Sequence, residues 1–128
     1  MAQSMVVDAS ALGAVIFGEP QRYEIAARVA GFSLCAPDIL PFELSNVCLS
    51  KCRRHPETRD DLFAKFELLR EFSIDLLDVN HSDVLLLAEE TGLSAYDAGY
   101  LWLAQQLDAE LVTLDGELAS AHALLRRS

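Results

Sequence analysis

The chain has 128 residues, of which 52% are hydrophobic, and ten Lys and Arg against twenty Asp and Glu give a formal net charge of −10. This composition predicts one folded domain with a hydrophobic core and excludes a disordered chain. An acidic protein is not expected to bind nucleic acid through its overall charge, because phosphates attract cations. No uncharged apolar run approaches the roughly 18 residues of a membrane span, and the first residues lack the basic start of a signal peptide. We therefore expect a cytoplasmic protein.

The cysteine and histidine residues do not indicate a metal site. The chain has three Cys residues, an odd number, which argues against a disulfide framework in a cytoplasmic protein. Cys48, Cys52 and His55 would share one face of a helix, but a single helix cannot surround a tetrahedral zinc ion. We interpret the cysteines as small buried residues, and we expect His55, His81 and His122 at the surface or at helix ends.

The predicted elements alternate between strands and helices. Residues 1–4 precede a second methionine and are interpreted as an alternative start or a cloning remnant, so the domain is expected at 5–128. Short apolar, β-branched runs predict strands, while helical periodicity with Gly and Pro at the breaks predicts helices. In chain order we expect a strand at 5–7, helices at 10–17 and 20–31, a strand at 32–36, helices at 38–54 and 56–72, a strand at 74–79, helices at 82–91 and 94–107, a strand at 111–113 and a last helix at 116–125.

Strands separated by helices predict parallel β-α units with helices on both faces of the sheet. The fold class is therefore a three-layer α/β/α single domain with a short, mostly parallel central sheet. In such folds, ligands bind outside the carboxyl ends of the strands. The sequence shows no repeat, linker or second domain.

Four acidic residues interrupt apolar segments near this predicted edge. Asp8 and Asp115 follow the first and last strands, and Glu43 and Asp97 lie in the first turns of two helices. Acidic side chains are rarely buried unless they are paired, hydrogen-bonded or bound to a metal. Because the topology can bring all four to one edge of the sheet, we interpret them as a candidate site.

Each acid also has a purely structural interpretation, which stays open. Asp8 and Asp115 could be N-caps of the helices that follow, and Ser94 with Asp97 has the spacing of a capping box. Glu43 could complement a helix dipole.

Four motifs in this order carry a resemblance to a known family. They are Val-Val-Asp8-Ala-Ser10-Ala-Leu, Pro41-Phe-Glu43-Leu-Ser-Asn46-Val, Tyr96-Asp97-Ala-Gly-Tyr100-Leu and Leu-Val-Thr113-Leu-Asp115. From about Met5 to Ala121 the chain resembles a PIN domain, most of all the VapC-type toxins of bacterial and archaeal toxin–antitoxin pairs. Members of this family usually continue into a final edge strand, which is doubtful here because the chain ends at Leu-Leu-Arg-Arg-Ser.

The resemblance implies a metal-dependent endoribonuclease and a set of partners. Asp8, Glu43, Asp97 and Asp115 would be the catalytic acids that hold Mg²⁺ or Mn²⁺. The hydroxyl groups of Ser10 and Thr113 would support the site. The implied partners are an RNA substrate, a cognate antitoxin that covers the acidic groove, and a second copy of the chain in a homodimer.

A basic stretch that begins at Lys51 is a candidate for guiding the RNA backbone. Five of the ten cations lie within fifteen residues there, and a local basic surface can attract a polyanion to an acidic protein. A solvated helix face is the structural interpretation of the same run. The candidate RNA-backbone residues are Lys51, Arg53, Arg54 and Arg59.

The chemistry of the four acids favours the same activity independently. Carboxylates gathered in one pocket repel each other unless a cation binds them, and hard divalent cations prefer oxygen ligands. A metal-bound water can attack a phosphodiester in line and leave a 5′-phosphate, which requires no histidine.

Other α/β domains with acidic sites fit the sequence less well. A receiver domain needs a late lysine, and none follows Lys65. A haloacid-dehalogenase-type phosphatase needs Asp at position 10, which is Ser10, and an integrin-type Asp-x-Ser-x-Ser motif fails at Leu12. The alternative that remains is a non-catalytic PIN-like module that binds protein or RNA.

Overall fold

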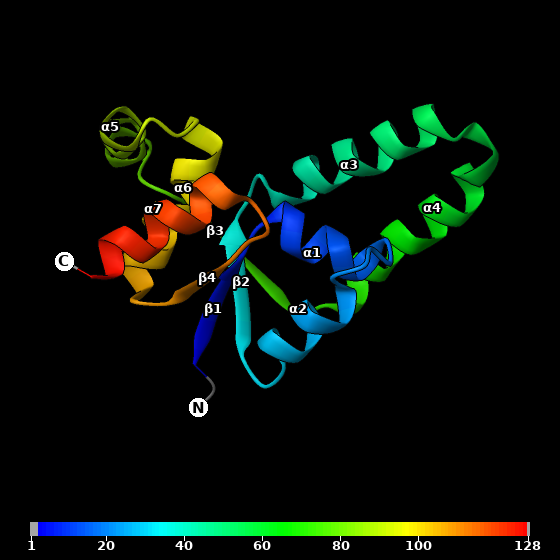
Figure 1. The fold of residues 1–128 in the computed structure, drawn as a ribbon, viewed down its shortest axis with the longest axis horizontal. Helices are drawn as coiled ribbons and strands as arrows, with labels where there is room; N and C mark the ends of the chain where they lie inside the picture. The colour runs from blue at the N-terminus through cyan, green and yellow to red at the C-terminus, as the bar shows by residue number, and fades with distance from the viewer. Residues whose placement is uncertain (1–2, 128) are drawn as a thin grey trace.

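The computed structural model describes residues 3–127, and within them a four-stranded sheet is flanked by helices (Figure 1). The elements, with η for a 3-10 helix, are β1 (Ser4–Val7), α1 (Ala9–Ile16), α2 (Arg22–Val29), β2 (Ser33–Pro37), α3 (Leu40–Arg54), η1 (Pro56–Thr58), α4 (Arg59–Phe66), η2 (Glu67–Glu71), β3 (Ile74–Leu77), α5 (His81–Thr91), α6 (Ala95–Leu107), β4 (Glu110–Val112) and α7 (Gly116–Arg126). The interpretation of residues 1–4 falls partly outside the described residues. Ser4 itself is the first residue of β1 and pairs with Ser33.

The sheet has the strand order β3-β2-β1-β4, and every pairing is parallel. The central strand β1 is therefore hydrogen-bonded on both sides, which suits a short run of buried β-branched residues. Within residues 3–127 the sheet has no fifth strand. Because all strands point the same way, their carboxyl ends meet at one edge, where Asp8 follows β1.

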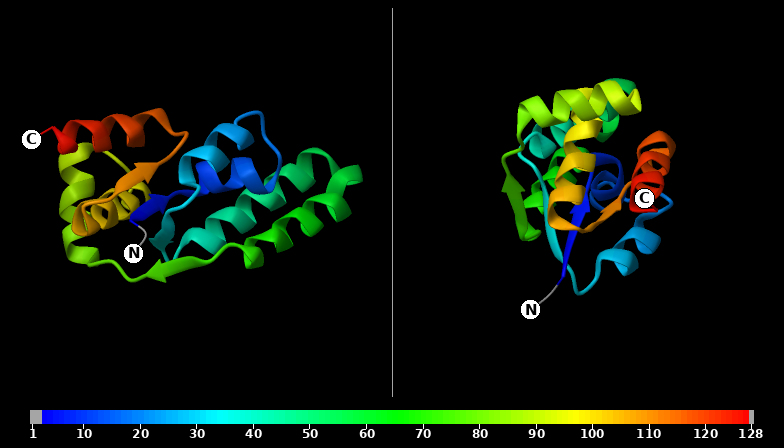
Figure 2. Two further views of the ribbon diagram at one scale, coloured as in Figure 1. Left: turned by 90° about the horizontal axis from the view of Figure 1, so that it is seen from below. Right: turned by 90° about the vertical axis from the view of Figure 1, so that its left-hand side faces the viewer.

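Side chains alternate between the two faces of the sheet and build two hydrophobic clusters. Val6 belongs to one cluster with Tyr100 and Leu101 of α6. Its neighbours Met5 and Val7 belong to the other, which includes residues of α1 and α2. Figure 2 shows the sheet between these helices. The three-layer α/β/α prediction is confirmed.

Helices α3 and α4 pack side by side as an arm that extends beyond the sheet (Figures 1 and 2). Along the arm the Cys48 thiol donates to the Leu62 carbonyl oxygen, 3.7 Å away. Cys35, Cys48 and Cys52 are all free and buried, as expected for small core residues. The arm is anchored where Leu44 meets α1: a Cβ on Gly13 would lie 3.6 Å from a Leu44 methyl carbon.

The helix predicted at 56–72 is wrong as a continuous element. Pro56 begins η1, α4 follows, and the segment ends in η2. In this last part the chain turns toward β3, and Leu69, Phe72 and Ile74 pack against the core. Because this change depends on packing with distant residues, helical periodicity alone could not reveal it.

His122 is buried, contrary to the prediction that it lies at the surface or a helix end. Its side chain, on α7, faces β4, and its Nε2 accepts a hydrogen bond of 3.2 Å from the Leu111 backbone N–H. Since β4 is an edge strand, this N–H has no partner in the sheet and requires another acceptor. His55 and His81 are exposed, as predicted. No helix in the described part of the chain is long and apolar enough to cross a membrane.

Candidate active site

The four predicted acids meet at the carboxyl edge of the sheet. Asp8 follows β1, and Asp115 begins α7 just after β4. Glu43 lies in the first turn of α3, and Asp97 in the first turn of α6. Their charges act on one another: Asp97 and Asp8 on Glu43, and Asp115 and Asp8 on Asp97. The topology therefore gathers acids that are up to 107 positions apart in the sequence.

Asp8 is held by a network that joins β1 to the β4–α7 connection. Asp8 is 5% exposed, and its carboxylate accepts hydrogen bonds from the Ser10 hydroxyl at 2.7 Å and from the Thr113 hydroxyl. The same two hydroxyl oxygens accept the backbone N–H of Leu114 at 2.9 Å and of Asp115 at 3.0 Å. Each hydroxyl hydrogen is thus directed at Asp8, and the orientation of this carboxylate is linked to the position of Asp115.

Asp8 and Asp115 are also helix N-caps, as the structural interpretation required. Asp8 accepts from the Ala11 N–H and Asp115 from the Leu118 N–H, both at 3.0 Å. The predicted capping box at α6 is only half formed. Ser94 accepts from the Asp97 N–H at 3.1 Å, but within residues 3–127 no hydrogen bond reaches the Asp97 carboxylate. Capping therefore accounts for one hydrogen bond of Asp8 and one of Asp115. It accounts for none at the Asp97 carboxylate, which is left available to bind a cation.

Glu43 is positioned by Tyr100, a residue whose role is not apparent from the sequence motifs. The Tyr100 hydroxyl donates to Glu43 Oε1 at 2.7 Å, and the ring is 1% exposed in the core below. This bond spans 57 residues. The available signal was the spacing of Asp97 and Tyr100, three residues apart on α6, which places both on the same helix face.

Burial and mutual repulsion raise the pKa values of Asp8, Glu43 and Asp97. Burial raises the pKa of Asp8 despite the hydrogen bonds from Thr113, Ala11 and Ser10. Burial also raises the pKa of Glu43, against the lowering effect of the Tyr100 hydrogen bond. The pKa of Asp97 is raised by burial and then by the charges of Asp115 and Asp8. Such a cluster is unfavourable when fully ionised, and a bound cation would relieve it.

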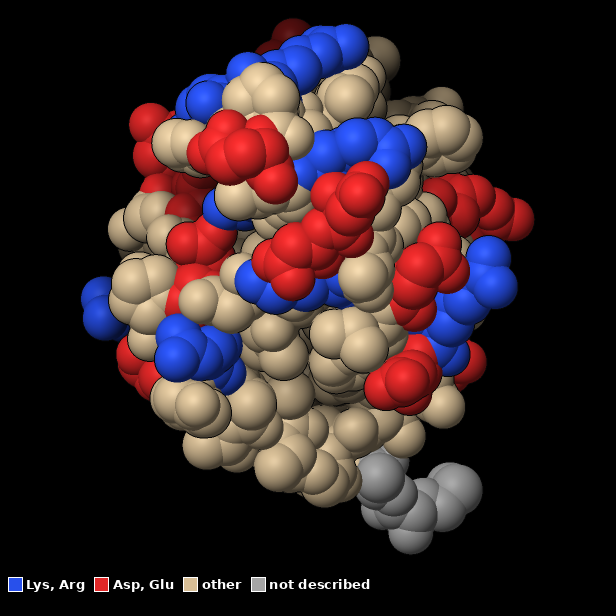
Figure 3. Space-filling view, turned by 90° about the vertical axis from the view of Figure 1, so that its right-hand side faces the viewer, with Lys and Arg blue, Asp and Glu red and all other residues tan. Residues whose placement is uncertain are grey.

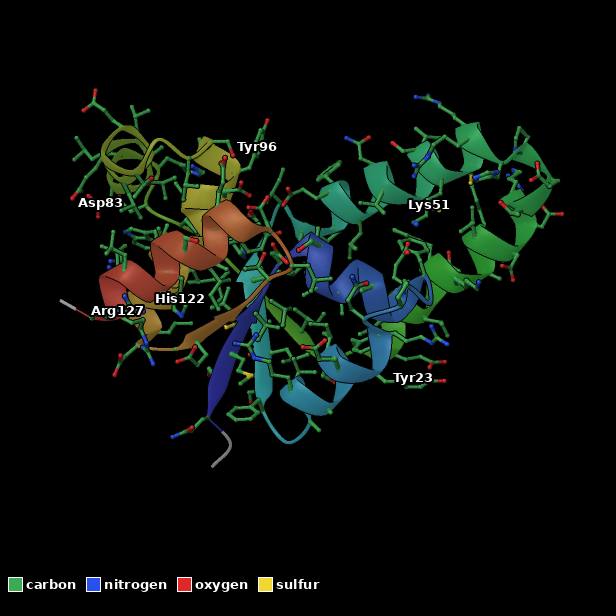
Figure 4. All side chains as sticks on the ribbon, in the orientation of Figure 1. Tyr23, Lys51, Asp83, Tyr96, His122 and Arg127 are labelled. Atoms are coloured by element: carbon green, nitrogen blue, oxygen red, sulfur yellow. The ribbon has the colours of Figure 1, made fainter. Side chains whose placement is uncertain are left out.

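The basic candidates do not lie at this edge. Lys51 pairs with Glu19, and Arg59 pairs with Asp60 at 2.8 Å. Figure 4 places Lys51 in the outer half of α3, away from the start of α6, which Tyr96 marks. Seen from the end of the α3–α4 arm, Lys and Arg alternate with Asp and Glu (Figure 3). The arm presents mixed charges rather than a continuous basic surface.

Comparison with known families identifies the domain as a whole. The model of the PIN domain matches residues 5–124. The chain belongs to the PIN domain family. A curated relative, Ribonuclease VapC3 of Pyrobaculum aerophilum, is 34% identical over 121 residues, which cover 90% of this chain and 92% of the relative. The crystal structure of PAE2754 from Pyrobaculum aerophilum has a TM-score of 0.74 and 27% identity, and the match covers 99% of this chain and 97% of the other.

The donor set of this PIN domain suits a hard divalent cation. PIN-domain ribonucleases generally depend on such a metal. All four side chains at the edge supply carboxylate oxygen, the ligand that Mg²⁺ and Mn²⁺ prefer. Within residues 3–127, no three Asp, Glu, His or Cys side chains are grouped closely enough to form a ready-made ligand cage. Mg²⁺ usually keeps several waters and takes one or two protein carboxylates.

Asp97→Asn should stabilise the PIN domain in chelator at neutral pH. The folded-state pKa of Asp97 lies above its ordinary value of 3.8, so the folded state binds this proton more tightly than the unfolded state. Stability is therefore lost as pH rises from 3.8 through the raised folded-state pKa. The variant should melt at a higher temperature than wild type at pH 7, and the difference should vanish on acidification.

Thermal melts in EDTA across this pH range measure the effect. Asp75→Asn, a substitution at an exposed position of β3, is the matched control and should leave the melting temperature unchanged. A variant that is less stable than wild type at pH 7 in EDTA would contradict the repulsion between Asp97 and the other acids.

Tyr100→Phe should reduce cleavage by about tenfold, the effect typical of residues that orient a metal ligand. Loss of the hydroxyl frees the Glu43 carboxylate and removes a hydrogen bond that lowers its pKa. The acidic limb of the rate–pH profile should therefore move to higher pH. Rate–pH profiles of both proteins measure this. A lower rate with no shift of that limb would indicate a purely structural role for Tyr100.

Proposed function

We propose that this PIN domain is an endoribonuclease that depends on Mg²⁺ or Mn²⁺ and acts as the toxin of a toxin–antitoxin pair. The observation that carries the activity is the buried Asp8 carboxylate, oriented by two hydroxyl groups at an edge where three other acids lie. The curated relative named Ribonuclease VapC3 supports RNA as the substrate.

In this proposal the four acids hold the cation and its waters. Asp8 is fixed by Ser10 and Thr113, and Tyr100 binds only one oxygen of Glu43, which leaves Oε2 of Glu43 without a hydrogen bond among the described residues. Among the described residues, Asp115 likewise accepts a hydrogen bond only through Oδ1, which caps α7. A bound Mg²⁺ or Mn²⁺ would acidify a water for attack on the phosphodiester and offset the charge of the leaving oxygen. The products would carry a 5′-phosphate.

The chain's partners form part of the proposal. We expect a homodimer in the cytoplasm whose acidic edge is covered by a segment of the cognate antitoxin. The charge of the edge favours a basic segment as the cover, because four acids there repel one another when ionised. Such a segment would inhibit the enzyme by occupying the place of the metal and the RNA phosphate.

Lys51, Arg53, Arg54 and Arg59 are proposed to guide the RNA backbone. The exposed pair Arg53 and Arg54 offers a test, because each phosphate contact with single-stranded nucleic acid adds about 0.7 to the salt dependence of log affinity. The double substitution Arg53→Gln, Arg54→Gln should lower the slope by up to about 1.4. Titrations of RNA into each protein at several salt concentrations measure this slope. Arg28→Gln on α2 is the control and should leave the slope unchanged. An equally unchanged slope in the double variant would remove Arg53 and Arg54 from the RNA-binding surface.

The decisive experiment is digestion of RNA by protein free of antitoxin. Wild type and Asp8→Asn, purified in parallel, are incubated with RNA in Mg²⁺, Mn²⁺ or EDTA. We expect cleavage that requires metal and is lost in the variant, together with metal-induced stabilisation of wild type. Cleavage that persists in Asp8→Asn would indicate a contaminating nuclease. If neither cleavage nor metal-induced stabilisation is observed, the non-catalytic binding module becomes the better interpretation.

A further inference from the structure

A separate pocket lies beside the acidic edge. Its volume is about 340 Å³, and it is lined by the end of β2 and the connection that follows at 37–39, by Val79 and α5, and by the start of α6. Most of the lining side chains are apolar, among them Ile39 and Leu85. The polar groups are those of Asp38, His81 and Tyr96. This mixture differs from the acidic edge, where all the candidate ligands are carboxylates.

Helix geometry places the pocket directly next to the candidate active site. Ile39, the N-cap of α3, precedes Glu43 by four residues, and Tyr96 precedes Tyr100 by four residues on α6. Residues four apart lie on one face of a helix, and Tyr100 is hydrogen-bonded to Glu43. The pocket therefore begins one helical turn beyond that hydrogen bond, and Tyr96 is also the neighbour of Asp97.

Tyr96 gives the pocket an accessible aromatic wall. Its side chain is 62% exposed at the start of α6 (Figure 4), although large aromatic side chains commonly bury their rings. Aromatic rings that are accessible beside a nucleic-acid site offer a platform on which unpaired bases stack. The hydrogen-bonding groups of Asp38 and His81 can meet the polar edges of a base.

The size of the pocket favours a single base over a segment of protein. Pockets for small ligands begin near 300 Å³, and 340 Å³ lies at this lower limit. A docked helix is about 10 Å wide and uses several anchors along a groove. A base that is paired and stacked within a duplex could not enter.

We propose that this pocket binds one unpaired nucleobase next to the cleaved phosphodiester, stacked on Tyr96. The proposal rests on the proposed ribonuclease function. The pocket determines which bond is cut by selecting the base beside it, while the four acids act on the phosphate.

The test combines a protein substitution with removal of a base. The bond that wild type cleaves in an unstructured RNA oligonucleotide is mapped first, and kcat and KM are then measured. Tyr96→Ala should raise KM by about tenfold with little change in kcat, and Tyr96→Phe should recover most of the loss. Tyr23→Ala is the matched control, because Tyr23 is 74% exposed on α2 and lies far from Tyr96 in Figure 4.

Abasic oligonucleotides then identify the occupant. Removing the base on one side of the cleaved bond should raise the KM of wild type by about tenfold and should have no further effect on Tyr96→Ala. If the two losses simply add, the base does not contact Tyr96 and the proposal is overturned. The same conclusion follows if Tyr96→Ala behaves like Tyr23→Ala.

Binding without turnover and the oligomeric state provide two independent tests of the pocket. Intact and abasic oligonucleotides are titrated into Asp8→Asn, with and without Tyr96→Ala. A tenfold difference in affinity supports the pocket even if wild type does not cleave RNA, and no difference overturns it. Light scattering shows whether Tyr96→Ala changes the oligomeric state. Such a change would assign the pocket to an interface between copies of the chain, which also overturns the proposal.

Discussion

Asp8→Asn should fold normally and cleave RNA at least about 100-fold more slowly than wild type, since it removes a charged ligand from the proposed metal site. Asn keeps the shape of Asp and an oxygen that can accept from the Ala11 N–H, so the cap of α1 is retained. Its amide nitrogen can donate to the Thr113 oxygen in place of the bond that Asp8 accepts. The loss of activity therefore reports on the carboxylate charge rather than on the fold.

The stability of the same variant should change in the opposite direction from its activity. Burial raises the pKa of Asp8, with a contribution from the charge of Asp115, so the ionised group is less favourable in the folded than in the unfolded state. In EDTA at pH 7, Asp8→Asn should melt at or above the temperature of wild type, and Mg²⁺ should stabilise it less. Asp75→Asn should retain both activity and metal response. A variant that is inactive because it is unfolded would refute this account.

Leu44→Ala should destabilise the protein by about 2–5 kcal/mol, the usual cost of removing a fully buried Leu side chain. Leu44 is 0% exposed and joins α3 to α1, since its methyl carbon lies 3.6 Å from the position of a Cβ on Gly13. The free energy of unfolding of a typical domain is only about 5–15 kcal/mol. The substitution therefore removes a large share of the stability of the protein. Cleavage should fall with it, because α3 carries Glu43 in the preceding position.

Leu49→Ala is the matched control, on the same helix but 38% exposed. Leu49→Ala should lower the free energy of unfolding by less than about 1 kcal/mol, because much of this side chain already contacts water. Urea unfolding, followed by circular dichroism, measures both variants. Equal losses would contradict the assignment of Leu44 to the core that anchors the arm.

The order of the secondary structure could be predicted from the sequence, because the signals for it are local. Short β-branched runs end at polar residues; the run that ends with Val7, for example, is followed by Asp8. Helices end at glycine, and Gly92 ends α5 with a positive φ of 77°. The exception was the stretch 56–72, where no Gly or Pro marks the end of α4. There the packing of Leu69 and Phe72 against the core determined the local conformation.

The positions of the four acids were likewise predictable, since parallel strands bring their carboxyl ends to one edge. The resemblance also implied that Ser10 and Thr113 support the site, and both hydroxyl groups donate to Asp8. The partner of Glu43 was not predictable, because Tyr100 reaches it across 57 residues. His122 likewise meets the edge strand β4 only after α7 has packed against it.

The sequence alone thus determined the class of fold, the family and the acids that lie at the carboxyl edge, because these depend on local periodicity and on the order of motifs along the chain. Only the tertiary structure decided that the Ser10 and Thr113 hydroxyls donate to Asp8, that Tyr100 orients Glu43, and where the Tyr96 pocket lies. Hydrogen bonds and pockets of this kind join residues that are distant in the chain, and their geometry depends on how helices pack on the sheet.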